Sequence, residues 1–200
     1  MEYIFFTGAP GSKWSGLAKW IYWSKDVNHS DYHDDREYYR TGDDFPGHTG
    51  AYWDPGMEFQ LGEWDAPFKK DGGIKLIKSH TIAEDLEAYT DHPIIMVLRD
   101  DDKCFEWWKE AGGWNIDYPC YRYYENDDFM KSAIKAQNDG IREFVKNHDC
   151  LHVCNMLEVN RALGIGSPPT HNPRYPEEVL DNGMNRWLID TDIEVYLYKP

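Results

Sequence analysis

The sequence predicts an α/β fold in which a mainly parallel β-sheet is flanked by helices. Short apolar runs alternate with helical patterns along the chain. The first run breaks directly into a glycine-rich turn, GAPGSKWS at residues 8–15. The run IIMVL at residues 94–98 is continuously apolar, which is typical of a parallel strand covered on both faces. With 200 residues, 41% of them hydrophobic, the chain is expected to form one domain, residues 1–200.

The N-terminal residues predict a strand, a phosphate-binding loop and a helix. Residues 3–6 are apolar and aromatic enough for a buried strand, and a helix over 16–23 points its positive end toward the turn. Gly8 and Gly11 let backbone amides approach an anion. A standard triphosphate loop has lysine where Trp14 stands, so the loop indicates a phosphorylated ligand without naming it. The expected ligand-binding residues are Ala9, Pro10, Gly11, Ser12, Lys13, Trp14 and Ser15.

A long irregular connection over residues 25–73 follows, rich in Asp, Gly, Pro and Tyr, and we interpret it as a candidate substrate lid. Residues 73–78 alternate like a strand. A helix is expected over 82–89, capped by Thr81 with Glu84 three residues later. Further helices are expected over 104–110, 128–147, 157–163 and 176–188, and further strands over 94–98, 150–155 and 193–198.

Polar residues follow two of the predicted strands. Lys78 and His80 come at the end of the strand over 73–78, and Arg99 ends the strand over 94–98. Ligands of open α/β sheets bind beyond the carboxyl ends of the strands, where the glycine-rich loop also lies. Lys78 and His80 are two residues apart on an extended segment, so their side chains leave on the same face. We therefore expect them to reach one reaction centre.

Composition excludes several classes of partner. A net charge of −15 argues against binding nucleic acid through its phosphates. No apolar run is long enough for a membrane span and no signal-peptide pattern is present, so a cytoplasmic protein without a membrane partner is expected. Cys150, His152 and Cys154 alternate on one predicted strand, but a fourth zinc ligand is missing, so no metal is expected.

The order of these motifs resembles the sulfotransferases that use 3′-phosphoadenosine 5′-phosphosulfate (PAPS). Their first loop has the form Y-P-K-S-G-T-T-W, which residues 10–15, PGSKWS, match in a divergent form. Their second strand commonly ends in Lys-Thr-His, close to Lys78-Ser79-His80, and their third ends in an arginine, in the place of Arg99. The resemblance covers roughly the first 110 residues.

The resemblance implies a P-loop NTPase-like sulfotransferase fold and a metal-independent transfer of sulfate from PAPS to a hydroxyl or amine. Arg99 would bind the donor's 3′-phosphate, and Lys13 would neutralise the 5′-phosphosulfate. Lys78 would stabilise the leaving phosphate oxygen, and His80 would accept the acceptor's proton. The acceptor is a small molecule or a carbohydrate; the many Trp and Tyr residues favour a carbohydrate.

The sequence departs from the family at three places. Gly11 replaces the lysine of the loop, Trp107 stands where a serine completes the 3′-phosphate site, and residues 100–102 place three aspartates beside it. Arg99 also has a structural interpretation, as an ion-pair partner of Asp100 or Glu84. Two other functions stay open: a small-molecule or nucleotide kinase that uses ATP and magnesium, and a non-catalytic module that binds a nucleotide or carbohydrate.

Overall fold

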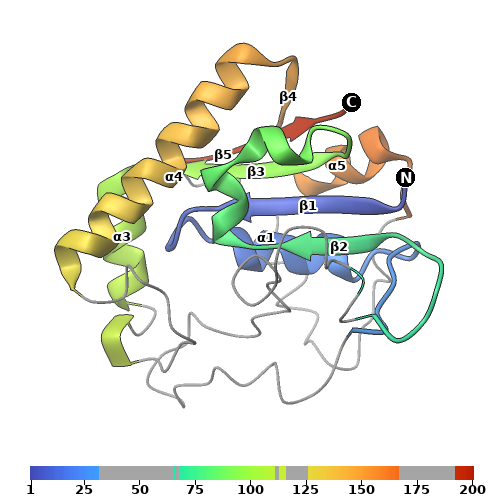
Figure 1. The fold of residues 1–200 in the computed structure, drawn as a ribbon, viewed down its shortest axis with the longest axis horizontal. Coiled ribbons are helices and arrows are strands. Elements are labelled where there is room, and N and C mark those ends of the chain that lie inside the picture. The colour runs from blue at the N-terminus through green and yellow to red at the C-terminus, as the bar shows by residue number, and fades with distance from the viewer. Residues whose placement is uncertain (32–64, 66–67, 111–112, 116–125, 167–191) are drawn as a thin grey trace.

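The computed structural model describes residues 1–31, 65, 68–110, 113–115, 126–166 and 192–200 (Figure 1). These residues form an α/β fold around a five-stranded sheet with the strand order β2-β1-β3-β5-β4. The strands are β1 (Tyr3–Gly8), β2 (Lys75–Lys78), β3 (Ile94–Arg99), β4 (Cys150–Val153) and β5 (Ile193–Tyr198). All five lie within one or two residues of the predicted strands, so the prediction of an α/β fold is confirmed.

The sheet is mixed, and the prediction of a mainly parallel sheet is wrong. β1 pairs in parallel with β2 and β3. β5 lies between β3 and β4 and is antiparallel to both. The apolar pattern of a strand shows which residues are buried but not which way the strand runs. The antiparallel direction brings the amino end of β5 to the edge where β1, β2 and β3 end.

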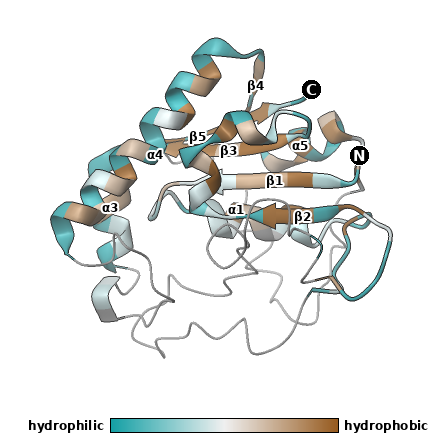
Figure 2. Ribbon diagram, viewed as in Figure 1, coloured by the Kyte–Doolittle hydropathy of each residue, from teal (hydrophilic) through white to brown (hydrophobic). Residues whose placement is uncertain are grey.

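Two layers of helices cover the sheet. On one face, α1 (Trp14–Tyr22) and α5 (Met156–Leu163) pack on side chains of β1, β3 and β5. On the other face, α4 (Asp127–Asn147) and two short 3₁₀ helices, η3 (His80–Glu84) and η4 (Leu86–Tyr89), cover Phe5, Ile94 and Met96. Figure 2 shows the result: apolar residues concentrate in the strands, and the outer side of α4 is polar.

A third, smaller core lies at the carboxyl edge of the sheet. There α3 (Asp101–Glu110) packs on the amino-terminal half of α4, and the short η5 (Gly113–Asn115) follows α3. Ala9 of the glycine-rich loop joins Cys104, Trp108, Met130 and Ile134 in this core. The loop is therefore packed against α3 and is part of the folded core.

Two local predictions need correction. The helix expected over 82–89 is instead η3 and η4, separated by Asp85, whose extended φ of −152° interrupts the helical path. Its N-cap is Ser79, whose side chain accepts from the amide of Thr81, and not Thr81 itself. The strand predicted over 150–155 is β4, which forms an edge of the sheet and on which Leu151 is 50% exposed.

Several predictions lie outside the described residues. They are most of the connection over 25–73, with its interpretation as a substrate lid, and the helix over 176–188. Among the helices that the structure does describe, none is long and apolar enough to cross a membrane.

Candidate functional site

The glycine-rich loop makes a tight turn between β1 and α1. The amide of Ser12 donates to the carbonyl of Ala9 at 3.0 Å, and Pro10 between them is buried. Gly11 and Lys13 both have positive φ, 78° and 65°. The helix then begins at Trp14, and Ser15 lies half-buried in its first turn. The amides of Gly16 and Leu17 donate to the carbonyl of Lys13, and the amides at the start of a helix, here those of Trp14 and Ser15, have no acceptor within the helix itself.

Gly11 is required by packing as well as by backbone conformation. A Cβ atom at this position would lie 1.8 Å from the carbonyl oxygen of Cys104 in α3. The sequence interpretation of Gly11, as a residue that lets amides approach an anion, did not foresee this contact. The loop and α3 are thus held together at a distance that only glycine permits.

Hydrogen bonds fix the end of β2 beside this loop. Thr7 Oγ1 donates to the carbonyl of Ser79 at 2.7 Å, and the amide of Ser79 donates to the carbonyl of Phe6 at 3.2 Å. Both contacts cross from β1 to the residue between Lys78 and His80. The segment that carries the predicted cation and base is therefore held in register with the loop.

Lys78 and His80 converge on Trp14 at the first turn of α1. The ammonium nitrogen of Lys78, a residue only 1% exposed, lies 4.8 Å from the centre of the Trp14 ring. The His80 ring meets the same indole edge-on at 4.7 Å between centres. The structure thus brings together the two residues that the sequence pattern assigned to one reaction centre.

A backbone contact sets the tautomer of His80. Its Nδ1 lies 2.8 Å from the carbonyl oxygen of Gly8. A carbonyl only accepts hydrogen bonds, so Nδ1 carries the proton, and in the neutral ring Nε2 is the basic nitrogen. The contact with the loop therefore fixes the orientation of the His80 imidazole.

Arg99 and Lys13 form a second group on the α3 side of the loop. Arg99 donates from Nη1 to the carbonyl of Gly11 at 3.1 Å and from Nε to Asp192 Oδ2 at 3.3 Å. The Lys13 ammonium lies 3.9 Å above the centre of the Trp107 ring. Burial lowers the pKa of Lys13, and the nearby charge of Arg99 lowers it further. These contacts and charges thus place Lys13 close to Arg99 and Trp107.

The ion-pair partner of Arg99 is neither Asp100 nor Glu84, the two that the sequence suggested. Asp100 Oδ1 instead accepts from the amide of Lys103 at 3.1 Å, in the first turn of α3. Glu84 accepts from the side chain of Gln137 at 3.1 Å. Among the described residues, the ion-pair partner of Arg99 is Asp192, directly before β5, which sequence reasoning missed because no motif surrounds it.

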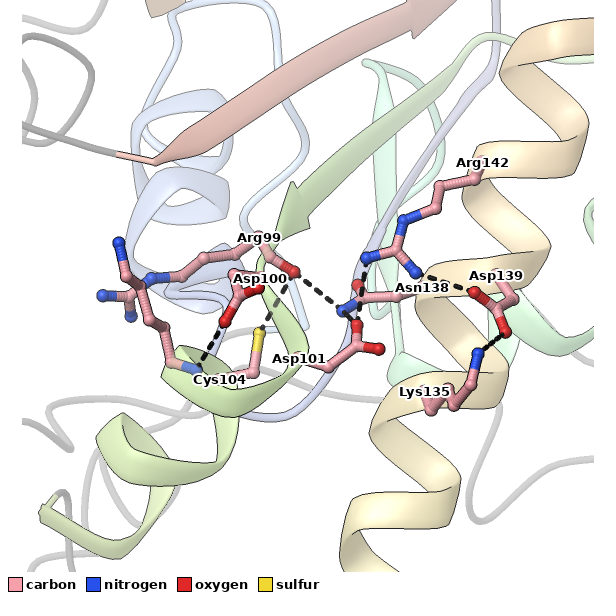
Figure 3. A network of polar contacts seen from close by, with 9 residues as sticks. Arg99, Asp100, Asp101, Cys104, Lys135, Asn138, Asp139 and Arg142 are labelled. Carbon is pink, nitrogen blue, oxygen red and sulfur yellow. Dashed lines mark hydrogen bonds and ion pairs between the residues drawn. The ribbon is translucent and has the colours of Figure 1, made fainter.

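Two of the three consecutive aspartates are engaged in structural contacts. Besides the cap made by Asp100, Asp101 Oδ1 accepts from Asn138 at 2.7 Å and from Arg142 at 3.0 Å. Asp102 is exposed on α3. Figure 3 shows this network leading away from Arg99 toward the outer face of α4. The negative charge of Asp101 is thus balanced by α4, which reduces its effect on an anion near the loop.

Ser12 contributes a buried hydroxyl to the loop. It is fully buried, and its Oγ has no hydrogen-bond partner among the described residues. A Cβ atom on Gly8 would lie 2.6 Å from this oxygen, so the hydroxyl lies against the backbone inside the turn. A buried polar group without a partner is costly, so this hydroxyl reduces the stability of the loop as the structure describes it.

No metal centre is formed by the residues that the structure describes, since no three His, Cys, Asp or Glu side chains there are placed to hold an ion. Comparison of the chain with protein-family models, with curated proteins and with solved structures finds no match. Chemical assignment of this site therefore depends on its own geometry.

Proposed function

We propose that this chain is a PAPS-dependent sulfotransferase with a P-loop-like sulfotransferase fold. The observation that carries the proposal is the convergence of Lys78 and His80 on Trp14, at the turn between the glycine-rich loop and α1. It places a buried cation and an imidazole beside the start of α1, where the leading amides have no acceptor within the helix. These are the groups that an in-line transfer from a phosphate leaving group requires.

Each of the candidate site residues has a separate role in the proposed reaction. His80 Nε2 takes the proton of the acceptor hydroxyl or amine, whose oxygen or nitrogen then forms a bond to sulfur. The bond between sulfur and the 5′-phosphate oxygen breaks in the same step, and Lys78 stabilises the negative charge that develops on that oxygen. Lys13 and Arg99, on the other side of the loop, hold the negative charges of the nucleotide.

Binding of the spent donor, 3′-phosphoadenosine 5′-phosphate, tests the proposal. Calorimetric titration without metal is expected to show binding by the wild type and at least tenfold weaker binding by Lys78→Met, because a buried charge contact is lost. Lys75→Met is the matched control. Lys75 lies on the same strand but pairs with Glu2 and Asp65, and its variant should bind within about twofold of the wild type.

A second titration uses ATP with magnesium. Binding of ATP and magnesium, with no binding of the bisphosphate, would replace the proposal by a kinase. His80→Gln tests the catalytic step separately from binding. The variant should bind the donor as the wild type does, but it should no longer transfer sulfate to a panel of carbohydrate and small-molecule acceptors. An equal rate in the wild type and His80→Gln would remove His80 as the base.

A further inference from the structure

Asp192 lies among three cations on the α3 side of the loop. Its Oδ2 lies 3.3 Å from Arg99 Nε and 3.0 Å from the ammonium nitrogen of Lys103. Asp192 also raises the pKa of Lys13, whereas Arg99 lowers it, so Lys13 responds to both charges. One carboxylate thus neutralises part of a cluster formed by Lys13, Arg99 and Lys103.

Two of these cations share one acid. Among the described residues, Asp192 forms ion pairs with both Arg99 and Lys103. Glu110 is a further acid whose charge acts on Lys13, and Asp101 and Asp102 lie in the first turn of α3. Because Arg99 and Lys103 meet at one carboxylate, a single anion in its place could contact both of them.

The strand register explains why Asp192 reaches this place. β5 is antiparallel to β3, and Ile193, its first residue, pairs with Arg99, the last residue of β3. The residue before Ile193 therefore lies beside the Arg99 side chain. A strand parallel to β3 would have placed its amino end at the opposite edge of the sheet.

The contacts of Asp192 are open to exchange. Its side chain is 22% exposed and that of Lys103 is 53% exposed, whereas that of Arg99 is 11% exposed. The pair with Lys103 reaches solvent and is weakened by water and salt, and the pair with Arg99 is more shielded. A phosphate group with two negative charges competes well for the same donors, particularly for a guanidinium, because it offers more acceptor oxygens and more charge.

We infer that Asp192 is an internal substitute for an anionic group of the ligand: it occupies the Lys13, Arg99 and Lys103 cluster until a phosphate of the ligand displaces it. This exchange regulates the site of the proposed function and rests on that proposal for the identity of the nucleotide. Ligand binding must break the ion pairs of Asp192 with Arg99 and with Lys103, so removing the carboxylate should tighten binding. The exchange also assigns Lys103, which no sequence motif indicated, to the ligand.

The test compares Asp192→Asn with Asp102→Asn, which removes the same charge from an exposed position on α3. Each protein is titrated with 3′-phosphoadenosine 5′-phosphate and, separately, with inorganic pyrophosphate at constant ionic strength. Asp192→Asn is expected to bind both probes about five- to tenfold more tightly than the wild type. Asp102→Asn is expected to change binding less than about twofold. Adding Arg99→Ala to Asp192→Asn should remove the gain.

The outcomes separate this inference from the proposed function. If only pyrophosphate binds, and binds Asp192→Asn more tightly, the exchange holds and the sulfotransferase proposal fails. If the bisphosphate binds the wild type at least as tightly as Asp192→Asn, the exchange is overturned and the proposed function stands. Failure of both probes to bind overturns both. If Asp192→Asn and Asp192→Ser both fail to fold, the exchange is also overturned, because a ligand could not displace a carboxylate that the fold requires.

Discussion

Replacing Gly11 with alanine tests how tightly the loop is packed on α3. The added Cβ would lie 1.8 Å from the Cys104 carbonyl oxygen, so the backbones must separate by roughly 1.2 Å to reach even the 3.0 Å that real contacts rarely go below. Such overpacking costs about 1–3 kcal/mol. The positive φ of 78° adds about 1–2 kcal/mol for any residue with a Cβ. Together these terms predict that the free energy of unfolding falls by about 2–5 kcal/mol.

Gly72 provides the matched control. Its φ is also 78°, but a Cβ there would meet nothing within 4 Å. Gly72→Ala therefore carries the conformational cost alone, about 1 kcal/mol after the gain from a less flexible unfolded chain. Urea unfolding followed by tryptophan fluorescence measures both variants. Equal decreases in the free energy of unfolding for Gly11→Ala and Gly72→Ala would refute the packing argument, whatever the size of these decreases.

Three further predictions concern thiols, pH and helix packing. Burial raises the pKa of Cys104 to about 12, so iodoacetamide at about pH 8 should modify exposed Cys154 quickly and Cys104 only after unfolding, as peptide mass spectrometry will show; rapid labelling of native Cys104 would contradict its burial. Burial alone would raise the pKa of Asp192, but the ion pairs with Lys103 and Arg99 outweigh burial and lower it. The carboxylate should therefore stabilise the fold fully above about pH 4, and this stabilisation should be lost as the pH falls through the lowered pKa. The difference in unfolding free energy between the wild type and Asp192→Asn should shrink over the same range, and a difference that grows in acid would contradict the prediction. Gly140→Ala adds a Cβ 2.5 Å from the Ala83 carbonyl oxygen. The cost of this clash should exceed the gain in helix propensity of about 1 kcal/mol, so the variant should be less stable than the wild type in thermal unfolding. A more stable variant would show that α4 and η3 separate easily.

Local sequence patterns were sufficient to find the first half of the site. The glycine-rich loop, the segment after β2 and the arginine that ends β3 each carry their signal within a few residues. Their meeting at one edge follows from the parallel pairing of β1 with β2 and β3. The spacing of Lys78 and His80 was therefore enough to predict that they lie together, but it carried no information about their shared contact with Trp14.

The rest of the candidate site, around Arg99 and Asp192, depends on the pairing of strands that are far apart in the sequence. Arg99 and Asp192 are 93 residues apart, and the contact arises from the direction and register of β5. An alternating strand looks the same in either direction, so the sequence pattern could not indicate that the amino end of β5 meets the site. The same limit applies to η3 and η4, where Asp85 interrupts a pattern that is otherwise typical of one helix.

The position of β5 also has a consequence for the order of folding. In the sheet, β4 pairs only with β5, and β5 is later in the chain than every other strand of the described sheet. While the protein is synthesised, β3 therefore keeps an unpaired edge, and β4 cannot join the sheet until β5 inserts between them. Unpaired apolar edges of this kind are prone to pair with other chains. Insertion of β5 thus completes the described sheet, and in the same step it brings Asp192 beside Arg99.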